Sequence, residues 1–219
     1  MNKESDTMPD QRTILSIQEA LKPFECPICT LIDQKNQKHI EILLYESVND
    51  RTLRKRFNKD EGFCSTHAKK VLAAGSPLNH AILYDALMEE KIKRLNNGKT
   101  LNETKPCLFC EKEKDSEAYL LKAFIDGIKI QSFYEAYKAE GVLCATHMDK
   151  ISQNIKKDKI LSEKLRSVAH QKYTYLSNVL KSIKEKHDYR KTHTKWNDEE
   201  KILWKNVTTL LVKNDDFRQ

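Results

Sequence analysis

Cysteine and histidine residues form the pattern in this chain that is most able to do chemistry. All six cysteines fall into two C-x2-C pairs and two C-x2-H motifs, so that none lies outside the pattern. The order is C-x2-C, 34 residues, C-x2-H, and then C-x2-C, 33 residues, C-x2-H. The first copy contains Cys26, Cys29, Cys64 and His67, and the second contains Cys107, Cys110, Cys144 and His147.

Thiolates and imidazoles at these spacings are typical ligands of Zn2+, which closes structural sites with three cysteines and one histidine in a tetrahedron. A C-x2-C pair binds one ion because the turn between the cysteines directs both sulfurs to the same side. A C-x2-H pair at a helix start does the same, since positions i and i+3 share a helix face. Each copy holds a complete set of four donors. We therefore predict one Zn2+ within each copy and two in the chain.

Other uses of the same residues stay open. The two C-x2-C pairs could share one all-cysteine site and leave the two C-x2-H pairs to form another. An iron–sulfur cluster also accepts three cysteines and a histidine. Cys26-Pro-Ile-Cys29 could be a redox dithiol or part of a thiol sensor, although no βαβ pattern surrounds it. A catalytic zinc would keep one position for water, which four protein ligands per ion do not favour.

The rest of the sequence offers little for catalysis. It contains no Gly-rich phosphate loop, HExxH pair or nucleophile elbow. The remaining histidines have no partner motif and are interpreted as core, boundary or surface residues; they are His39, His80, His170, His187 and His193. We therefore predict a non-enzymatic binding or scaffolding role toward an unidentified protein partner.

The segments between the motifs predict helices, because their apolar residues recur every three or four positions. The chain has only 5 Gly and 5 Pro, too few for the turns of a β architecture. Helix starts are expected at Asn49-Asp50, Ser76-Pro77 and Asn197. A hairpin of about 15 residues out and 15 back, at roughly 1.5 Å each, would return each C-x2-H motif to its C-x2-C pair. The predicted fold is all-α, with two tandem pseudo-repeat helical modules, each closed by a metal site of three cysteines and one histidine.

The strongest break in the helical pattern is the stretch from Asn96-Asn97-Gly98 to Pro106, which we take as the boundary between the modules. The predicted organisation has five parts. They are a flexible N-terminus (1–12), the first metal-binding module (13–97), a linker (98–106), the second metal-binding module (107–188) and a C-terminal segment with a helix (189–219).

Charge is unevenly distributed. Lys and Arg total 39 against 32 acidic residues, a net charge of +7, and residues 149–195 hold 13 basic and 5 acidic side chains. We interpret this segment as a solvated helix face, and a nucleic-acid interface through residues 149–195 is the alternative. No apolar run approaches the roughly 20 residues that cross a bilayer, and the first residues lack a signal-peptide core. A cytoplasmic protein without membrane insertion, with reduced cysteines, is therefore expected.

The chain resembles a group of uncharacterised bacterial and archaeal proteins that carry a duplicated CPxC…CxxH pattern. The matching pieces are Ile17-Gln18-Glu19-Ala20-Leu21, Cys26-Pro27-Ile28-Cys29, Gly62-Phe63-Cys64-Ser65-Thr66-His67 and Ala81-Ile82-Leu83-Tyr84-Asp85-Ala86-Leu87. The likeness extends to about residue 185. The second copy departs from the pattern at Leu108, where the first copy has Pro27. The resemblance implies zinc binding and no particular activity.

Overall fold

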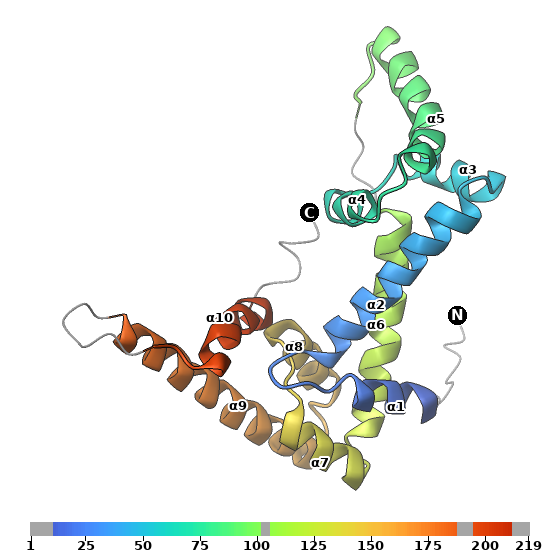
Figure 1. Ribbon diagram of the computed structural model, residues 1–219. Coiled ribbons are helices and arrows are strands. Elements are labelled where there is room, and N and C mark those ends of the chain that lie inside the picture. The colour runs from blue at the N-terminus through green and yellow to red at the C-terminus, as the bar shows by residue number, and fades with distance from the viewer. Residues whose placement is uncertain (1–10, 102–105, 188–194, 212–219) are drawn as a thin grey trace. The chain divides into compact units, whose positions relative to one another are not determined.

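The computed structural model describes residues 11–101, 106–187 and 195–211 (Figure 1). Regular structure in these stretches is helical, and their only β-type pairing is an isolated bridge between Lys22 and Glu25. The all-α prediction is confirmed. None of the described helices is both long and apolar enough to cross a membrane. In chain order they are α1 (Gln11–Glu19), α2 (Pro27–Ile42), the π-helical η1 (Leu43–Ser47), α3 (Arg51–Lys59), α4 (Ser65–Ala73), α5 (Pro77–Asn96), α6 (Leu108–Gly127), α7 (Gln131–Glu140), α8 (Ala145–Asn154), α9 (Lys159–Lys186) and α10 (Asp198–Leu211).

The described residues divide into two compact units. Unit 1 contains the residues up to Leu31 together with those from Ala118 onward, and unit 2 contains Ile32–Glu117. Helix α2 begins in unit 1 and ends in unit 2, whereas α6 begins in unit 2 and ends in unit 1. For this reason the units differ from the two sequence copies, each of which contributes to both.

Unit 1 is built around aromatic side chains of α6 and α7. The Phe124 ring meets the rings of Phe133 and Tyr137 edge to face, with centroids 5.7 and 5.1 Å apart. All three side chains are buried. The core is completed by aliphatic residues of α1, α2, α8 and α9, among them Ile17, Ile28, Ile151, Leu161 and Leu165.

Unit 2 has a second core, in which the last part of α2, η1 and α5 surround aromatic residues. Phe57 of α3 lies at its centre and meets Phe63 and Tyr84 edge to face, at centroid distances of 4.8 and 5.1 Å. Phe63 in turn stacks on Phe109 of α6 at 5.3 Å. The buried aliphatic members are Ile40, Leu43, Leu44, Val48, Val71, Leu83 and Leu87.

Two of the three predicted helix starts have the expected side-chain cap. The Asp50 carboxylate accepts a hydrogen bond of 2.7 Å from the Leu53 N–H, and the Asn197 side chain accepts one of 2.7 Å from the Glu200 N–H. Ser76 precedes Pro77 as expected but makes no cap hydrogen bond, because its backbone is left-handed, with φ +67°. The preceding residue, Gly75, also has a left-handed backbone, with φ +85°.

Candidate metal centres

The first cluster of sulfur and nitrogen atoms, which we name centre A, lies in unit 1. Its members are Cys26, Cys29, Cys144 and His147, whose donor atoms all lie within 4.8 Å of one another. The His147 Nδ1 atom is 3.4, 3.3 and 3.1 Å from the sulfurs of Cys26, Cys29 and Cys144. The sulfurs of Cys29 and Cys144 are 3.8 Å apart.

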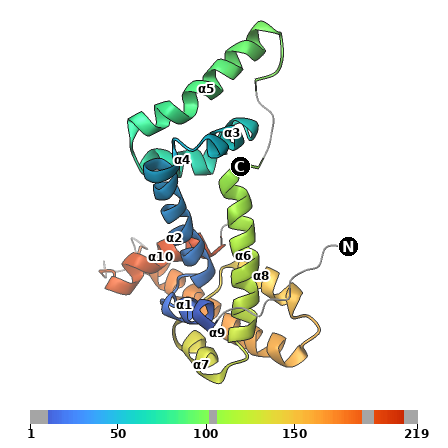
Figure 2. The same cartoon turned by 90° about the vertical axis from the view of Figure 1, so that its right-hand side faces the viewer.

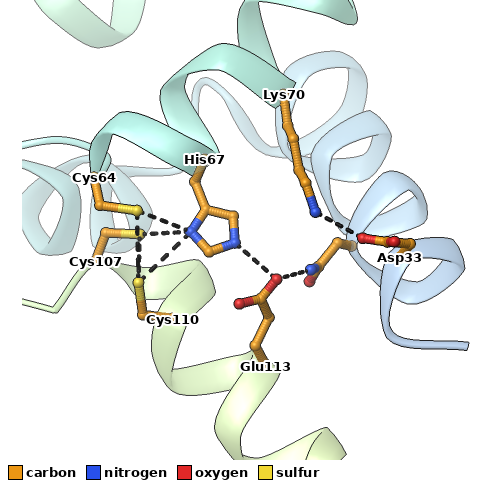
Figure 3. Close-up of polar contacts among 8 residues, drawn as sticks. Asp33, Cys64, His67, Lys70, Cys107, Cys110 and Glu113 are labelled. Atoms are coloured by element: carbon orange, nitrogen blue, oxygen red, sulfur yellow. Dashed lines mark hydrogen bonds and ion pairs between the residues drawn. The ribbon is translucent and has the colours of Figure 1, made fainter. Parts of the chain in front are cut away.

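The second cluster, centre B, lies in unit 2 and has the same composition (Figure 3). It consists of Cys64, His67, Cys107 and Cys110. His67 Nδ1 is 3.2, 3.4 and 3.6 Å from the sulfurs of Cys64, Cys107 and Cys110. The Cys110 sulfur is 3.6 Å from each of the other two sulfurs.

The eight predicted donors are thus brought together, but the predicted pairing within each copy is wrong. Each centre combines the C-x2-C pair of one copy with the C-x2-H motif of the other. The alternative with one all-cysteine site is wrong as well. The reason is the unequal length of the helices between the motifs, because α2 and η1 together have 21 residues whereas α3 has only 9. The second insert repeats this inequality, with 20 residues in α6 and 10 in α7, so neither insert is a hairpin of equal arms.

The spacing of the donors fits one tetrahedral ion in each centre. With Zn–S bonds of about 2.3 Å and Zn–N bonds of about 2.0 Å, the edges of a tetrahedron are about 3.8 Å between sulfurs and about 3.5 Å between sulfur and nitrogen. The sulfur pairs Cys29–Cys144, Cys107–Cys110 and Cys64–Cys110, at 3.6–3.8 Å, and the S–N distances of 3.1–3.6 Å match these edges. The six cysteines are free thiols rather than disulfides. The residues present therefore fit a metal of the zinc type.

Comparison with known proteins places the chain among proteins of unknown function. A family model described as "Family of unknown function (DUF6062)" matches residues 8–104. An "Uncharacterized 23.9 kDa protein in xynA 3'region" of Caldicellulosiruptor sp. (strain Rt8B.4) is 34% identical over 194 residues, which is 85% of this chain and 94% of that protein. The chain belongs to the DUF6062 family. No solved structure matches it significantly. The part matched by the DUF6062 model holds one motif of each centre, the C-x2-C pair of centre A and the C-x2-H motif of centre B.

Every donor pair stands at the beginning of a helix. Cys64 and Cys144 are the N-cap residues of α4 and α8, which place His67 and His147 in the first turn. Cys26 and Cys107 immediately precede α2 and α6, whose first turns carry Cys29 and Cys110. Each centre is therefore formed by two helix N-termini. The unpaired N–H groups and the positive dipole end of a helix N-terminus stabilise thiolates, and three thiolates with one neutral imidazole around a divalent cation would have a net charge of −1.

Two glycines allow the chain to reach the C-x2-H motifs. Helix α3 ends at Lys59, and Glu61 and Gly62 follow its cap with left-handed backbones, at φ +60° and +93°; the Gly62 N–H donates to the Phe57 carbonyl at 2.9 Å, two residues before Cys64. Gly141 follows α7 and has ordinary backbone angles, but it packs directly against the Tyr137 ring and Leu21. The close approach leaves no room for a side chain at position 141.

Centre B has a supporting layer that sequence reasoning missed. The other ring nitrogen of His67, Nε2, lies 3.0 Å from a carboxylate oxygen of Glu113, and the same oxygen accepts a hydrogen bond from the Asn36 amide. All three side chains are buried. A carboxylate behind a metal-binding histidine fixes the ring and its tautomer. The sequence contains signals for both residues. Glu113 follows Cys110 by three positions on α6, which places it on the same helix face as this donor, and Asn36 lies four residues from both Ile32 and Ile40 on the apolar face of α2.

Ion pairs hold α3 and α4 in place around centre B. Lys70 of α4 lies 2.7 Å from Asp33 of α2 (Figure 3). Arg56 of α3 lies 2.6 Å from Glu111 of α6 and 2.6 Å from Asp60. The first contact joins α4, which carries His67, to α2, and the pair of Arg56 with Glu111 joins α3 to α6.

The crowding of thiols shifts the pKa values at both centres. Burial disfavours both charged forms at centre B, yet the hydrogen bond between His67 and Cys107 raises the pKa of His67 to about 10 and lowers that of Cys107 to about 6. Burial, together with the neighbouring Cys107 thiolate, raises the pKa of Cys110 to about 12. At centre A, hydrogen bonds with Cys26 and Cys29 lower the pKa of Cys144, while hydrogen bonds with Cys144 and Cys26 raise the pKa of Cys29. The positive charge of a bound metal cation would offset the repulsion between thiolates, so that each coordinating thiol would be deprotonated.

The other histidines lie outside both centres, as far as the structure describes them. His80 Nδ1 lies 2.9 Å from the Ser76 carbonyl, and His187 packs against Trp196 at a centroid distance of 5.2 Å. Burial, together with Lys112, Lys35 and Lys38, lowers the pKa of His39. His193 lies outside the described residues.

Proposed function

We propose that the protein binds two structural Zn2+ ions and presents a metal-stabilised helical scaffold to a protein partner. The observation that supports this most is the four-donor composition of each centre, with three sulfurs and one imidazole nitrogen at tetrahedral spacing. Soft thiolates with an imidazole favour zinc among the common cellular metals. When bound, zinc supplies cross-links between distant parts of the chain.

A structural role follows from the number of donors. Four protein ligands fill the tetrahedral shell, so neither ion keeps a position for water or substrate. The donors also join segments that are far apart in sequence: Cys26 is 121 residues from His147, and His67 is 40 residues from Cys107. Metal binding that closes such loops contributes directly to folding, on the order of 10 kcal/mol per structural zinc.

Single-ion spacing also separates zinc from an iron–sulfur cluster. In a cluster each iron takes its own thiolates, which spreads the ligands over more than one metal. Three sulfur pairs, one in centre A and two in centre B, are 3.6–3.8 Å apart, and all donor atoms of a centre lie within 4.8 Å of one another, as expected around one ion. Zinc is therefore the proposed metal at both centres.

Elemental analysis of the full chain, purified without added metal, tests the proposal. We expect two zinc ions per chain, one after His147→Asn, and two after the control His170→Asn, which alters an exposed histidine of α9. Chelation should abolish most of the helical circular dichroism. Iron with visible absorbance, or full helicity after complete zinc removal, would contradict the proposal.

A second candidate function is binding of a nucleic-acid duplex, favoured by a basic groove in unit 1. The groove has a volume of about 850 Å3 and runs along the last part of α8 and the first half of α9. Lys156, Lys159 and Arg166 line it with a single acidic residue, Glu163, and with the hydroxyls of Ser152, Ser162 and Ser167. Its lining contains no Phe, Tyr or Trp, and its only ring is the imidazole of His170, so the groove suits phosphates better than stacked bases.

Salt dependence distinguishes this function from a neutral protein interface. Three phosphate contacts give a slope of log K against log [salt] of about −2.7 for a short DNA duplex. Lys156→Glu should weaken binding and reduce that slope by about 1. The control Lys184→Glu makes the same charge change on α9 outside the groove. Binding that is absent at low salt, or unchanged by Lys156→Glu, would count against the groove.

A further inference from the structure

Helix α5 is apolar on two faces, of which unit 2 covers only one. Its inner face buries Leu83 and Leu87, and its Tyr84 packs against Phe57. Its outer face leaves four large apolar side chains in solvent: Leu78 is 72% exposed, Met88 61%, Ile92 50% and Leu95 58%. A surface helix with one buried stripe normally carries polar residues on the remaining faces. The second apolar face therefore needs another explanation.

The outer side chains follow the spacing of a coiled-coil seam. With Ala81 and Asp85, which are also exposed, they occupy six positions at alternating intervals of three and four residues. This is the a/d pattern of a heptad repeat, maintained over almost the whole 20-residue helix. We name the six residues the outer stripe: Leu78, Ala81, Asp85, Met88, Ile92 and Leu95.

The position of α5 within unit 2 leaves the outer stripe accessible. The first half of the helix lies beside α3 and α4, and its second half leads away from them (Figure 1, Figure 2). The ion pairs of the second half lie on another side of the helix, where Lys91 and Arg94 reach Glu61 at 2.8 and 2.6 Å. These contacts fix the orientation of α5 and keep Met88, Ile92 and Leu95 in solvent.

We propose that the outer stripe is a dimer interface, in which α5 of one chain pairs antiparallel with α5 of a second copy. A two-fold axis between positions 85 and 88 makes the stripe complementary to itself. It sets Leu78 against Leu95 of the partner subunit, Ala81 against Ile92 of the partner subunit, and Asp85 against Met88 of the partner subunit. The two ends of the seam thus pair leucine with leucine, and the small Ala81 faces a large isoleucine, an arrangement compatible with knobs-into-holes packing around a two-fold axis.

The position of Asp85 selects the antiparallel arrangement over the parallel one. Parallel helices would place Asp85 against Asp85 of the partner subunit, in an apolar seam, where two like charges repel. The antiparallel pair opposes each carboxylate to a methionine instead of to a second carboxylate. Asp85 thus lowers the stability of the dimer but determines that its two α5 helices run antiparallel.

The area available agrees with a reversible dimer. The four large side chains expose on the order of 400 Å2 in each chain, the size of patch that marks interaction sites. Burial of this surface on both copies, with the helix atoms between the side chains, amounts to roughly 1,000 Å2, at the lower limit for specific interfaces. We therefore expect a dissociation constant in the micromolar range.

Sedimentation equilibrium of the full chain between about 1 and 100 μM tests the proposal. The unaltered chain should pass from monomer to dimer over this range, and Met88→Glu should stay monomeric. Lys93→Glu makes a charge change on an exposed position outside the stripe and should dimerise normally. Asp85→Leu should tighten the dimer at least tenfold. Helical circular dichroism and two metal ions per chain in every variant would show that folding is intact, independently of the association measured.

A combined variant tests the direction of the helices. Leu78→Glu and Leu95→Lys in one chain place opposite charges against each other across an antiparallel pair, and like charges across a parallel pair. The combined variant should dimerise better than either single variant. A monomer at 100 μM for the unaltered chain, a dimer that survives Met88→Glu, or a combined variant weaker than both single ones would overturn the proposal.

Discussion

Cys26 and His147 lie 121 positions apart in the chain, yet the Cys26 sulfur is 3.4 Å from the Nδ1 atom of His147. In centre B, likewise, Cys107 of the second copy lies beside His67 of the first copy. Because each centre takes one motif from each copy, neither half of the chain contains a complete site. The duplication therefore produces two interdependent halves rather than two self-sufficient zinc modules.

The exchanged pairing makes a prediction for double variants. Cys26→Ser with Cys144→Ser removes two ligands from centre A alone, so this protein should retain one zinc per chain. Cys26→Ser with Cys64→Ser removes one ligand from each centre and should leave neither with full occupancy. Zinc measured after dialysis against a mild chelator distinguishes the two. Pairing within each copy requires the opposite result, with one zinc kept by the second variant and none by the first.

Glu113 should strengthen metal binding at centre B without being a ligand. Glu113→Gln keeps the shape of the side chain but removes the negative charge 3.0 Å from His67 Nε2. Loss of such a supporting carboxylate typically costs 10–100-fold in metal affinity. Competition with a chromophoric chelator should show this loss for one zinc of the two. The control Glu111→Gln alters a carboxylate that faces Arg56 instead and should leave both affinities unchanged.

The sequence was sufficient to predict what depends on neighbouring residues. The helices and the caps at Asp50 and Asn197 follow from spacings shorter than eight residues, as do the C-x2-C and C-x2-H motifs themselves. Which motifs pair depends instead on the position that the chain reaches after a helical run of 21 residues and a following helix of 9 residues. The π-helical segment Leu43–Ser47, which prolongs the outward run, has no clear signature in the sequence. Glu113 was missed because its partner, His67, comes from a different copy.

Gly141 should tolerate no side chain, for steric reasons alone. Its φ of −77° suits any residue, but an added Cβ would overlap the buried Tyr137 ring and lie 2.9 Å from Leu21 Cδ2. Gly141→Ala should therefore lower the free energy of unfolding by about 1–3 kcal/mol, the usual cost of overpacking. At Gly75, where φ is +85° and an added Cβ meets nothing within 4 Å, the substitution to Ala brings backbone strain without a clash. A Gly141→Ala protein as stable as the unaltered chain in urea would refute the steric argument.

Glu200 should attach α10 to α9 in a pH-dependent way. Its buried carboxylate accepts hydrogen bonds from Lys186 at 2.7 Å, from the Asn197 N–H at 2.9 Å and from Ser182 at 2.8 Å. The Lys186 contact, with the Asn197 backbone, lowers the pKa of Glu200 below its ordinary 4.5. Because the pKa is lower in the folded state, the stabilisation is complete above pH 4.5 and is lost as the pH falls through the folded value.

Glu200→Gln should accordingly loosen α10 at neutral pH, and its difference from the unaltered chain should shrink as the pH falls below about 4. The two tryptophans, Trp196 and Trp204, both lie in or next to α10, so their fluorescence reports on this helix locally. Both proteins have the same metal centres, so any effect of acid on these centres is removed when their fluorescence is compared at each pH. Glu185→Gln, at an exposed position of α9, is the matched control. A fluorescence difference that is the same at pH 7 and pH 3 would exclude the charge of Glu200 as its cause.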